Sequence, residues 1–142
     1  MNRKQRRAAS KTIPKGQAQI SEFTTLVFQA AAKHDEGKME EAVQLYQQAI
    51  ALKSDYFESH LNLAIALHQL GRIQDAIVSY QNAIALDPNR NAPYIYLGMA
   101  LNLVGRYNEA IAIFERGLAL QPNDVQGYCN LGTALNAIGR FE

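Results

Sequence analysis

The sequence predicts an all-α fold built as a stack of helical hairpins, and two observations support this. A glycine recurs every 34 residues, at Gly37, Gly71, Gly105 and Gly139, and a pattern of small, apolar and aromatic residues repeats around it in the same register. Within each repeat, the apolar residues also follow helical spacing. A fixed period of this length indicates an array of similar units rather than a globular domain with one closed core.

The period divides the chain into a basic arm at residues 1–22 and an array at residues 23–142. The array comprises units at 23–56, 57–90 and 91–124, followed by a partial unit at 125–142. In each complete unit, two apolar stretches with helical spacing flank the glycine, so we predict an antiparallel hairpin of two helices, each of about 14 residues. The partial unit is predicted to contribute the first helix of a fourth hairpin.

Glycine and proline set the lengths of these helices. In the second unit, one apolar stretch ends at Gly71 and the next ends at Asp87-Pro88-Asn89. Glycine permits a left-handed backbone conformation at low cost, so it suits the turn inside the hairpin. Proline cannot continue a helix, so it suits the connection to the next hairpin.

Small and large residues alternate in a way that indicates close packing. Ala64 and Ala76, with Gly98 in the third unit, stand where the two helices of a hairpin would approach most closely. The aromatic residues Tyr80 and Phe114 would fill the space between neighbouring hairpins.

The net charge of +1 hides an asymmetry between the two ends of the chain. Residues 1–20 hold six basic side chains and no acidic one, which leaves 8 basic against 13 acidic side chains elsewhere. We predict that the arm is disordered, because it lacks apolar periodicity and is interrupted by Pro14 and Gly16. It is either a solvated tail or a site for nucleic acid or another anionic surface. The residues predicted to contact a polyanion are Arg3, Lys4, Arg6 and Arg7.

Composition and motifs argue against several other classes of protein. With 48% hydrophobic and 19% charged residues, the chain has enough apolar side chains to fold, but it contains no membrane-spanning or secretory segment, so we expect a cytoplasmic location. The lone Cys129 has no second cysteine with which to form a disulfide or share a zinc ion. No catalytic motif is present, and we expect no cofactor and no metal site.

These residues resemble the tetratricopeptide repeat, or TPR, a 34-residue motif. Its pattern includes a large residue at positions 4 and 11, Leu at 7, Gly or Ala at 8, Gly at 15, aromatic residues at 17 and 24, Ala at 20 and 27, and Pro at 32. The third unit matches the pattern at Tyr94, Leu97, Gly98, Leu101, Gly105, Tyr107, Ala110, Phe114 and Pro122. It departs at Gly117, and the first unit departs at Gln29 and Ser54. The resemblance covers the chain from about Phe23 onward and implies a right-handed superhelical solenoid.

In this family, the first helix of each hairpin lines an inner, concave groove. The resemblance therefore implies a peptide-binding site at Val27, Phe28, Ala31, Leu61, Asn62, Ile65, His68, Ile95, Tyr96, Met99, Asn102, Asn130 and Thr133. Since these positions include no lysine or arginine, the clamp with which chaperone-binding members hold an acidic C-terminus is absent. Asn62 and Asn130 resemble the asparagine ladder of O-linked N-acetylglucosamine transferases, although Phe28 and Tyr96 interrupt it. The asparagines fit a merely solvated helix face equally well.

We therefore expect a protein-interaction scaffold without enzymatic activity, which holds an extended or helical segment of a protein partner in the groove. The alternative is the substrate-recognition part of a larger transferase. Bacterial proteins that open with a stretch similar to MNRKQRRA and continue into such repeats often end in glycosyltransferase or methyltransferase domains. We also expect self-association through the partial fourth unit, where Leu131, Leu135 and Ile138 would be only partly covered.

Overall fold

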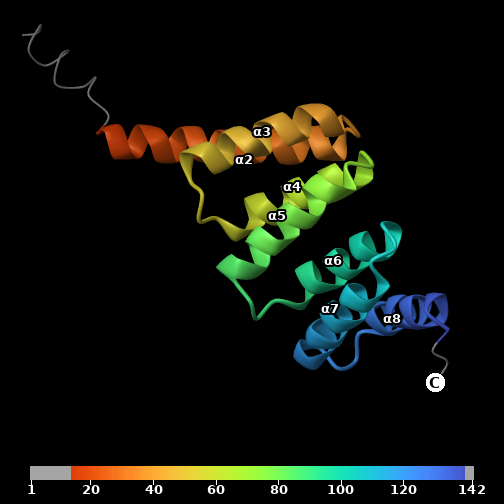
Figure 1. Cartoon of the computed structure of the whole chain (residues 1–142). Helices are drawn as coiled ribbons and strands as arrows, with labels where there is room; N and C mark the ends of the chain where they lie inside the picture. Colours follow the sequence, from red (N-terminus) through yellow and green to blue (C-terminus); the bar gives the residue numbers. More distant parts are fainter. Residues whose placement is uncertain (1–13, 140–142) are drawn as a thin grey trace, which may run out of the picture.

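The computed structural model describes residues 14–139, and every regular element within them is a helix. The helices are α2 (Lys15–Asp35), α3 (Met39–Leu52), α4 (Phe57–Gln69), α5 (Ile73–Leu86), α6 (Asn91–Leu103), α7 (Tyr107–Leu120) and α8 (Val125–Ala137). They form a stack that runs from α2 and α3 at one end to α8 at the other (Figure 1). The all-α prediction is confirmed.

Consecutive helices pair as the hairpins α2–α3, α4–α5 and α6–α7, and each turn depends on its glycine. The backbone of Gly71 has φ +78°, in the left-handed region that residues with a side chain rarely adopt. The turn caps α4, because the Gly71 N–H donates to the His68 carbonyl at 3.0 Å and the Arg72 N–H donates to the Leu67 carbonyl at 2.9 Å. The predicted role of the repeated glycine is therefore correct.

The prediction that residues 1–22 form a disordered arm is wrong for its last part, because α2 already begins at Lys15. Pro14 stands just before the helix, where its missing N–H costs nothing, and its carbonyl accepts hydrogen bonds from Gln17 and Ala18. Once the segment from residue 23 onward is packed against α3, each further helical residue adds one hydrogen bond without a new nucleation cost. Arg3, Lys4, Arg6 and Arg7 lie outside the described residues.

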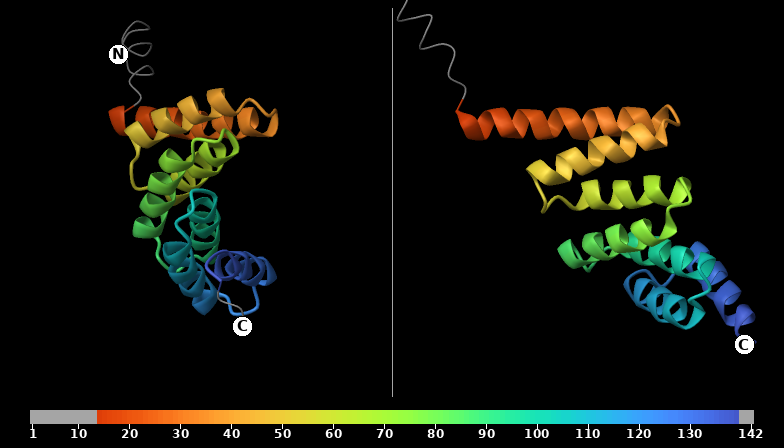
Figure 2. Two further views of the ribbon diagram at one scale, coloured as in Figure 1. Left: turned by 45° about the vertical axis from the view of Figure 1, so that its right-hand side comes forward. Right: turned by 45° about the horizontal axis from the view of Figure 1, so that its top comes forward.

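Packing between the helices depends on the expected alternation of small and large residues, but Phe114 packs on Gly98 within its own hairpin and not only between hairpins as predicted. Phe114 of α7 is fully buried, and a side-chain carbon added at Gly98 of α6 would overlap its ring. The equivalent residues of the second hairpin, Ala64 and Tyr80, are buried as well. Successive hairpins are rotated relative to one another, so the stack follows a superhelical path (Figure 2).

Among the described residues, no helix is both long enough and apolar enough to cross a membrane.

Candidate functional site

A pocket lies where the first helices of neighbouring hairpins meet. Helix α6 contacts both α4 and α8, and the three helices enclose this pocket together with the first residue of α7. Its volume is about 340 Å³, and it is lined by His68, Met99, Asn102, Leu103, Tyr107, Asn130, Thr133 and Ala137. We refer to it as the α4/α6/α8 pocket.

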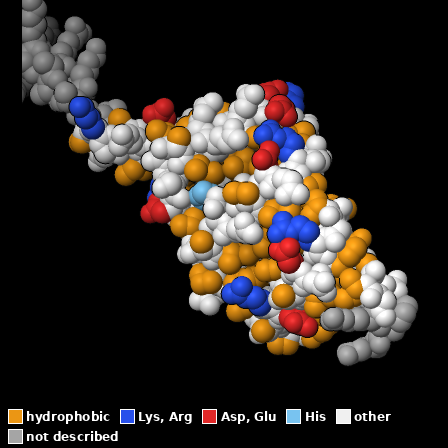
Figure 3. All heavy atoms as spheres, viewed as in Figure 1, with side chains coloured by type: hydrophobic (Ala, Val, Ile, Leu, Met, Phe, Trp, Pro, Cys, Tyr) orange, Lys and Arg blue, Asp and Glu red, His pale blue; other side chains and the backbone are white. Residues whose placement is uncertain are grey.

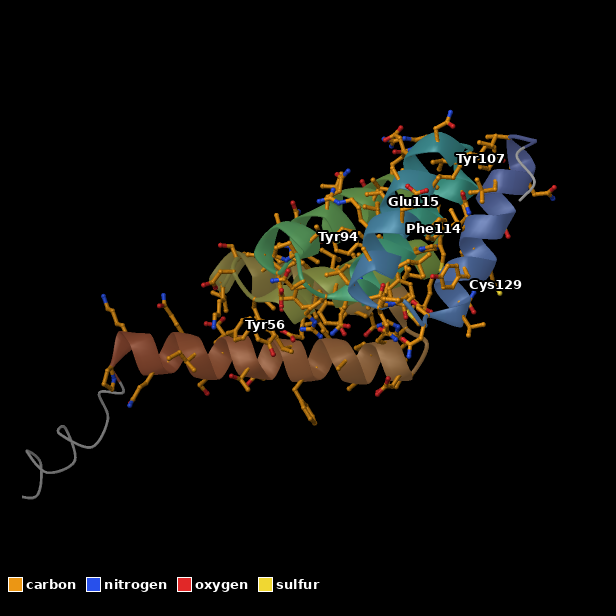
Figure 4. The ribbon with its side chains drawn as sticks, turned by 90° about the horizontal axis from the view of Figure 1, so that it is seen from below. Tyr56, Tyr94, Tyr107, Phe114, Glu115 and Cys129 are labelled. Atoms are coloured by element: carbon orange, nitrogen blue, oxygen red, sulfur yellow. The ribbon has the colours of Figure 1, made fainter. Side chains whose placement is uncertain are left out.

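The pocket brings together five residues of the predicted peptide-binding set: His68, Met99, Asn102, Asn130 and Thr133. The predicted set did not include Leu103, Tyr107 or Ala137. Tyr107 opens α7 (Figure 4), and the repeat pattern assigns an aromatic residue there to packing. Tyr107 was missed because the sequence does not show that the first residue of α7 reaches the surface that α4, α6 and α8 form.

Two asparagines connect α6 and α8 at the pocket. The side-chain amide of Asn102 donates to the backbone carbonyl of Asn130 at 3.3 Å, and the amide of Gln126 donates to Asn130 Oδ1 at 3.3 Å. Within the described residues, Asn102 Oδ1 and Asn130 Nδ2 have no hydrogen-bond partner. Both atoms are buried, so the pair retains one unused acceptor and one unused donor beneath the surface of the pocket.

An aromatic cluster extends from the pocket toward the second hairpin. The rings of Tyr80 and Tyr96 are stacked, with centroids 5.9 Å apart and planes inclined by 14°. The His68 ring meets Tyr80 edge-on, and its Nδ1 lies 3.3 Å from the Tyr80 hydroxyl. Burial lowers the pKa of His68 and raises that of Tyr80, because both charged forms lose solvation. The cluster is therefore uncharged at neutral pH.

The other predicted residues differ in how accessible they are. Leu61, Asn62 and Ile65 of α4 are half-buried, as are Val27 and Ala31 of α2. The side chain of Phe28 is 77% exposed, whereas that of Tyr96 is 37% exposed. We call these residues, together with the α4/α6/α8 pocket, the groove surface.

The prediction for Ile95 is wrong, because this side chain belongs to the core and is only 6% exposed. A side-chain carbon added at Gly117 or at Gly127 would lie 3.1 Å or 3.0 Å from Ile95 Cδ1. Ile95 therefore occupies the space that two glycines leave open, where a ligand cannot reach it. Only the contact of α6 with α7 and α8 shows this, since the helical register of Ile95 by itself places it near the groove.

Charged side chains pair with one another away from the pocket. Ion pairs join Lys33 to Glu41 at 3.2 Å, Arg72 to Asp75 at 3.0 Å and Arg90 to Glu58 at 2.9 Å. On the face drawn in Figure 3, basic and acidic groups lie next to each other between areas of hydrophobic atoms. No aspartate, glutamate, lysine or arginine lines the α4/α6/α8 pocket. Its chemistry is that of apolar side chains, amides and one neutral imidazole.

A second hollow, of about 490 Å³, lies at the start of α2 and was not predicted. It is lined by Gly16, Gln19, Ile20, Phe23, Thr24, Leu52 and Lys53. The ammonium group of Lys53 lies 5.6 Å from the ring centroids of both Phe23 and Tyr56, a cation–π arrangement. The hollow exists because α2 begins eight residues before the repeat frame does, a feature that tertiary packing rather than the repeat determines.

Within residues 14–139, no group of three or more His, Cys, Asp or Glu side chains is arranged to hold a metal ion.

Comparison with known protein families identifies the repeat. A family model described as TPR repeat matches residues 31–71 and 98–139, and one described as tetratricopeptide repeat matches residues 57–90. No curated protein sequence matches the chain.

Solved structures with this fold include TPR domains in complex with peptides. The first TPR domain of Spaghetti (RPAP3), bound to the HSP90 peptide SRMEEVD, is 23% identical with a TM-score of 0.80, and the match covers 83% of this chain and 94% of that one. The second TPR domain of human RPAP3, in complex with the HSP70 peptide SGPTIEEVD, is 25% identical with a TM-score of 0.78, covering 82% and 97%.

A further similar structure, MamA, is 25% identical with a TM-score of 0.80, and the match covers 82% of this chain and 68% of that one. The family models together span more than half of the sequence. The structural matches show the same stacked-hairpin fold. The chain therefore belongs to the tetratricopeptide repeat family.

Proposed function

We propose that this chain is a protein-interaction module that binds an uncharged, moderately apolar peptide segment along its groove surface, with the α4/α6/α8 pocket at the centre of the site. The observation that carries this proposal is the composition of the pocket, which combines apolar side chains with two asparagines and no charged group. The structurally similar RPAP3 domain in complex with an HSP70 peptide supports a peptide as the class of ligand.

The side chains of the groove surface suit a peptide in two ways. Met99, Leu103 and Tyr107 provide an apolar wall on which a peptide side chain can be buried. The half-buried Asn62 provides an amide that can both donate to and accept from a peptide backbone, and Asn102 and Asn130 would do the same once their side chains turn toward the pocket. Backbone hydrogen bonds supply affinity without regard to sequence, and the apolar wall selects the side chain.

The uncharged pocket also disfavours the acidic peptides seen with the similar structures. Both SRMEEVD and SGPTIEEVD end in carboxylate-rich sequences. A carboxylate that loses water without a paired cation costs several kcal/mol, and no lysine or arginine lines the pocket. Ligands of this chain are therefore expected to be neutral where they contact α6 and α8.

Selection from a random peptide library provides a test that does not require the natural partner. Phage-displayed peptides are selected on the immobilised full chain, and enriched sequences are synthesised with a fluorophore for anisotropy measurements. We expect neutral sequences containing leucine, methionine or aromatic residues, with affinities that change little with salt. SRMEEVD serves as the acidic comparison peptide and is expected to bind at least about tenfold more weakly, a difference of about 1.4 kcal/mol.

Variants locate the binding site of the selected peptides. Asn62→Ala and Tyr96→Ala are each expected to weaken binding by about 1–2 kcal/mol while unfolding remains cooperative. Val78→Ala is the matched control, because Val78 lies on α5, a second helix, and is 56% exposed. Loss of binding in the Val78 variant, together with normal binding in the other two, would place the site on the second helices and refute the proposal.

A further inference from the structure

Helix α8 carries an apolar stripe that residues 14–139 leave largely uncovered. Val125 is 74% exposed and Tyr128 is 53% exposed. Around Gly132, no described atom lies within 4 Å of the position that a side-chain carbon would take. Together with the partly buried Leu135, these residues follow the 3-4-3 spacing of a helix–helix seam. We call Val125, Tyr128, Gly132 and Leu135 the α8 stripe.

The repeat itself shows what kind of contact such a stripe makes. Gly132 occupies the repeat position of Gly98 and Ala64. At that position in the third hairpin, an aromatic ring of the antiparallel partner helix, Phe114, packs directly on Gly98. The equivalent residues of the second hairpin, Ala64 and Tyr80, are also buried. An aromatic ring over a small residue, contributed by an antiparallel helix, is thus the contact that the third hairpin makes and that α8 lacks within residues 14–139.

The α8 stripe contains both halves of that contact. If two copies of α8 lie antiparallel with a twofold axis beside Asn130, residue 128 of one copy lies opposite residue 132 of the other. Tyr128 of each copy then covers Gly132 of the second copy, and Val125 of each copy lies opposite Leu135. Such an interface is isologous, because the same pair of contacts forms twice.

Charge favours a second copy as the occupant. Residues 125–137 contain no Asp, Glu, Lys, Arg or His, so two α8 helices approach without repulsion between like charges. An antiparallel pair also sets the helix dipoles in the favourable opposed orientation. We propose that this chain forms a symmetric dimer through antiparallel contact of the α8 stripes.

The opposite end of the stack explains why the contact closes as a dimer and does not extend into a filament. The open face of α2 and α3 is lined largely by polar side chains, including Gln29, Lys33, Glu41 and Gln48. Head-to-tail stacking would place Lys33 and Glu41 against Tyr128 and Val125, and desolvation of these charges would disfavour it. A twofold contact buries only the apolar end.

The expected dimer is weak, because each copy contributes a single helix of 13 residues to the interface. Specific interfaces of less than about 1,200 Å² are usually transient, so we expect a Kd of about 10–500 μM. Sedimentation equilibrium of the full chain between about 5 μM and 1 mM covers this range. A monomer at every concentration overturns the proposal.

A swap of the two contacting side chains tests the register. Gly132→Tyr places two tyrosines opposite each other, and Tyr128→Ala removes both rings, so each single variant is expected to weaken the dimer at least tenfold. The double variant Tyr128→Ala/Gly132→Tyr restores one ring over one small residue in each contact and should recover most of the affinity. If the double variant is as weak as the worse single variant, the proposed register is wrong.

We expect the monomer to tolerate a side chain at Gly132, so that loss of the dimer is not confused with loss of the fold. A side-chain carbon added at position 132 has no described atom within 4 Å, and leucine has a higher helix propensity than glycine. Gly132→Leu is therefore expected to keep the helical circular dichroism of the wild type and to weaken the dimer at least tenfold. Gln126→Leu places the same side chain on another side of α8 and is the matched control. Equal loss of the dimer in both variants overturns the assigned seam.

Cys129 gives an independent readout of orientation. It is exposed and is the only cysteine in the chain, and Figure 4 shows it projecting from the outer side of α8. In the proposed dimer, two spin labels at Cys129 lie within about 25 Å of each other, roughly two helix diameters. A distance between the two labels well beyond this value would contradict the antiparallel contact. If the wild type stays monomeric and binds a synthetic peptide of the α7 sequence, the α8 stripe has another occupant.

Discussion

The two ends of this stack are built from the same repeat but present opposite surfaces. At the α2–α3 end, Gln29 and Lys33 occupy the repeat positions that Leu131 and Leu135 occupy in α8. Lys33 pairs with Glu36 and Glu41, whereas the leucines of α8 pack on one side only. The difference shows that polar side chains at the stacking positions allow one end of a solenoid to face water, while the backbone of the repeat stays the same.

The largest expected effect compares an interior position with the equivalent position at the α8 end. Gly98→Leu should destabilise the protein by about 3 kcal/mol, because the new side chain overlaps the buried ring of Phe114. Gly132→Leu should be neutral or slightly stabilising. Urea denaturation at a concentration where the protein is monomeric measures both. Similar destabilisation of the two variants would mean that Gly132 is as closely packed as Gly98.

Ala76→Leu extends the same comparison to the second hairpin. Ala76 is completely buried in α5, and overpacking there should cost about 1–3 kcal/mol. Ala112→Leu is the matched control, since Ala112 lies in the middle of the second helix of a hairpin and is exposed. An unchanged denaturation midpoint for Ala76→Leu would show that the helices of this hairpin can separate without cost.

Hydrogen exchange sharpens the comparison between the interior of the stack and α8. Within residues 14–139, helix α6 is packed against α4, α5, α7 and α8, whereas α8 packs mainly against α7 and α6. Amides of α8 should therefore exchange at least about tenfold faster than those of α6 in the monomer, a difference of about 1.4 kcal/mol in opening free energy. Equal protection of the two helices would show that α8 opens only with the whole array.

The basic arm adds charge to the polar end of the stack. Deletion of residues 1–13 removes five of the six basic side chains found in residues 1–20 and leaves α2 intact. We expect the wild type to be retained on heparin at low salt and the truncated chain to elute without retention, with unchanged melting. Retention of the truncated chain with the same salt dependence would place the polyanion site elsewhere.

The smallest effect concerns pH at the groove surface. Burial lowers the pKa of His68 in the folded protein, so the unfolded chain binds a proton more readily. Above the ordinary pKa of histidine, about 6.5, His68 is neutral in both states and its burial costs no stability. As the pH falls below this value, the unfolded chain takes up a proton first, so the free energy of unfolding decreases. The melting temperature should therefore decrease slightly from pH 7.5 to 5.5. His68→Gln should flatten this dependence, while His34→Gln, one repeat earlier, should preserve it.

Local pattern was sufficient to predict much of this protein. The turn at Gly71, the close approach of two helices at Gly98 and the helical hairpins all follow from residues that are close in sequence or repeat at a fixed period. The resemblance to a known repeat then predicted five residues of the α4/α6/α8 pocket. Periodic sequences determine their own frame, because each unit can bury its apolar face only against its neighbours.

Contacts between units decided the rest. Ile95 lies in the core because Gly117 and Gly127, from two other helices, leave room for it. Tyr107 lines the pocket because α7 begins beside α8, and α2 extends to Lys15 because a packed helix continues at little cost. The sequence alone thus determined which helices form and how they pair. Only the tertiary structure decided which faces remain open, since exposure depends on residues that come from different units of the stack.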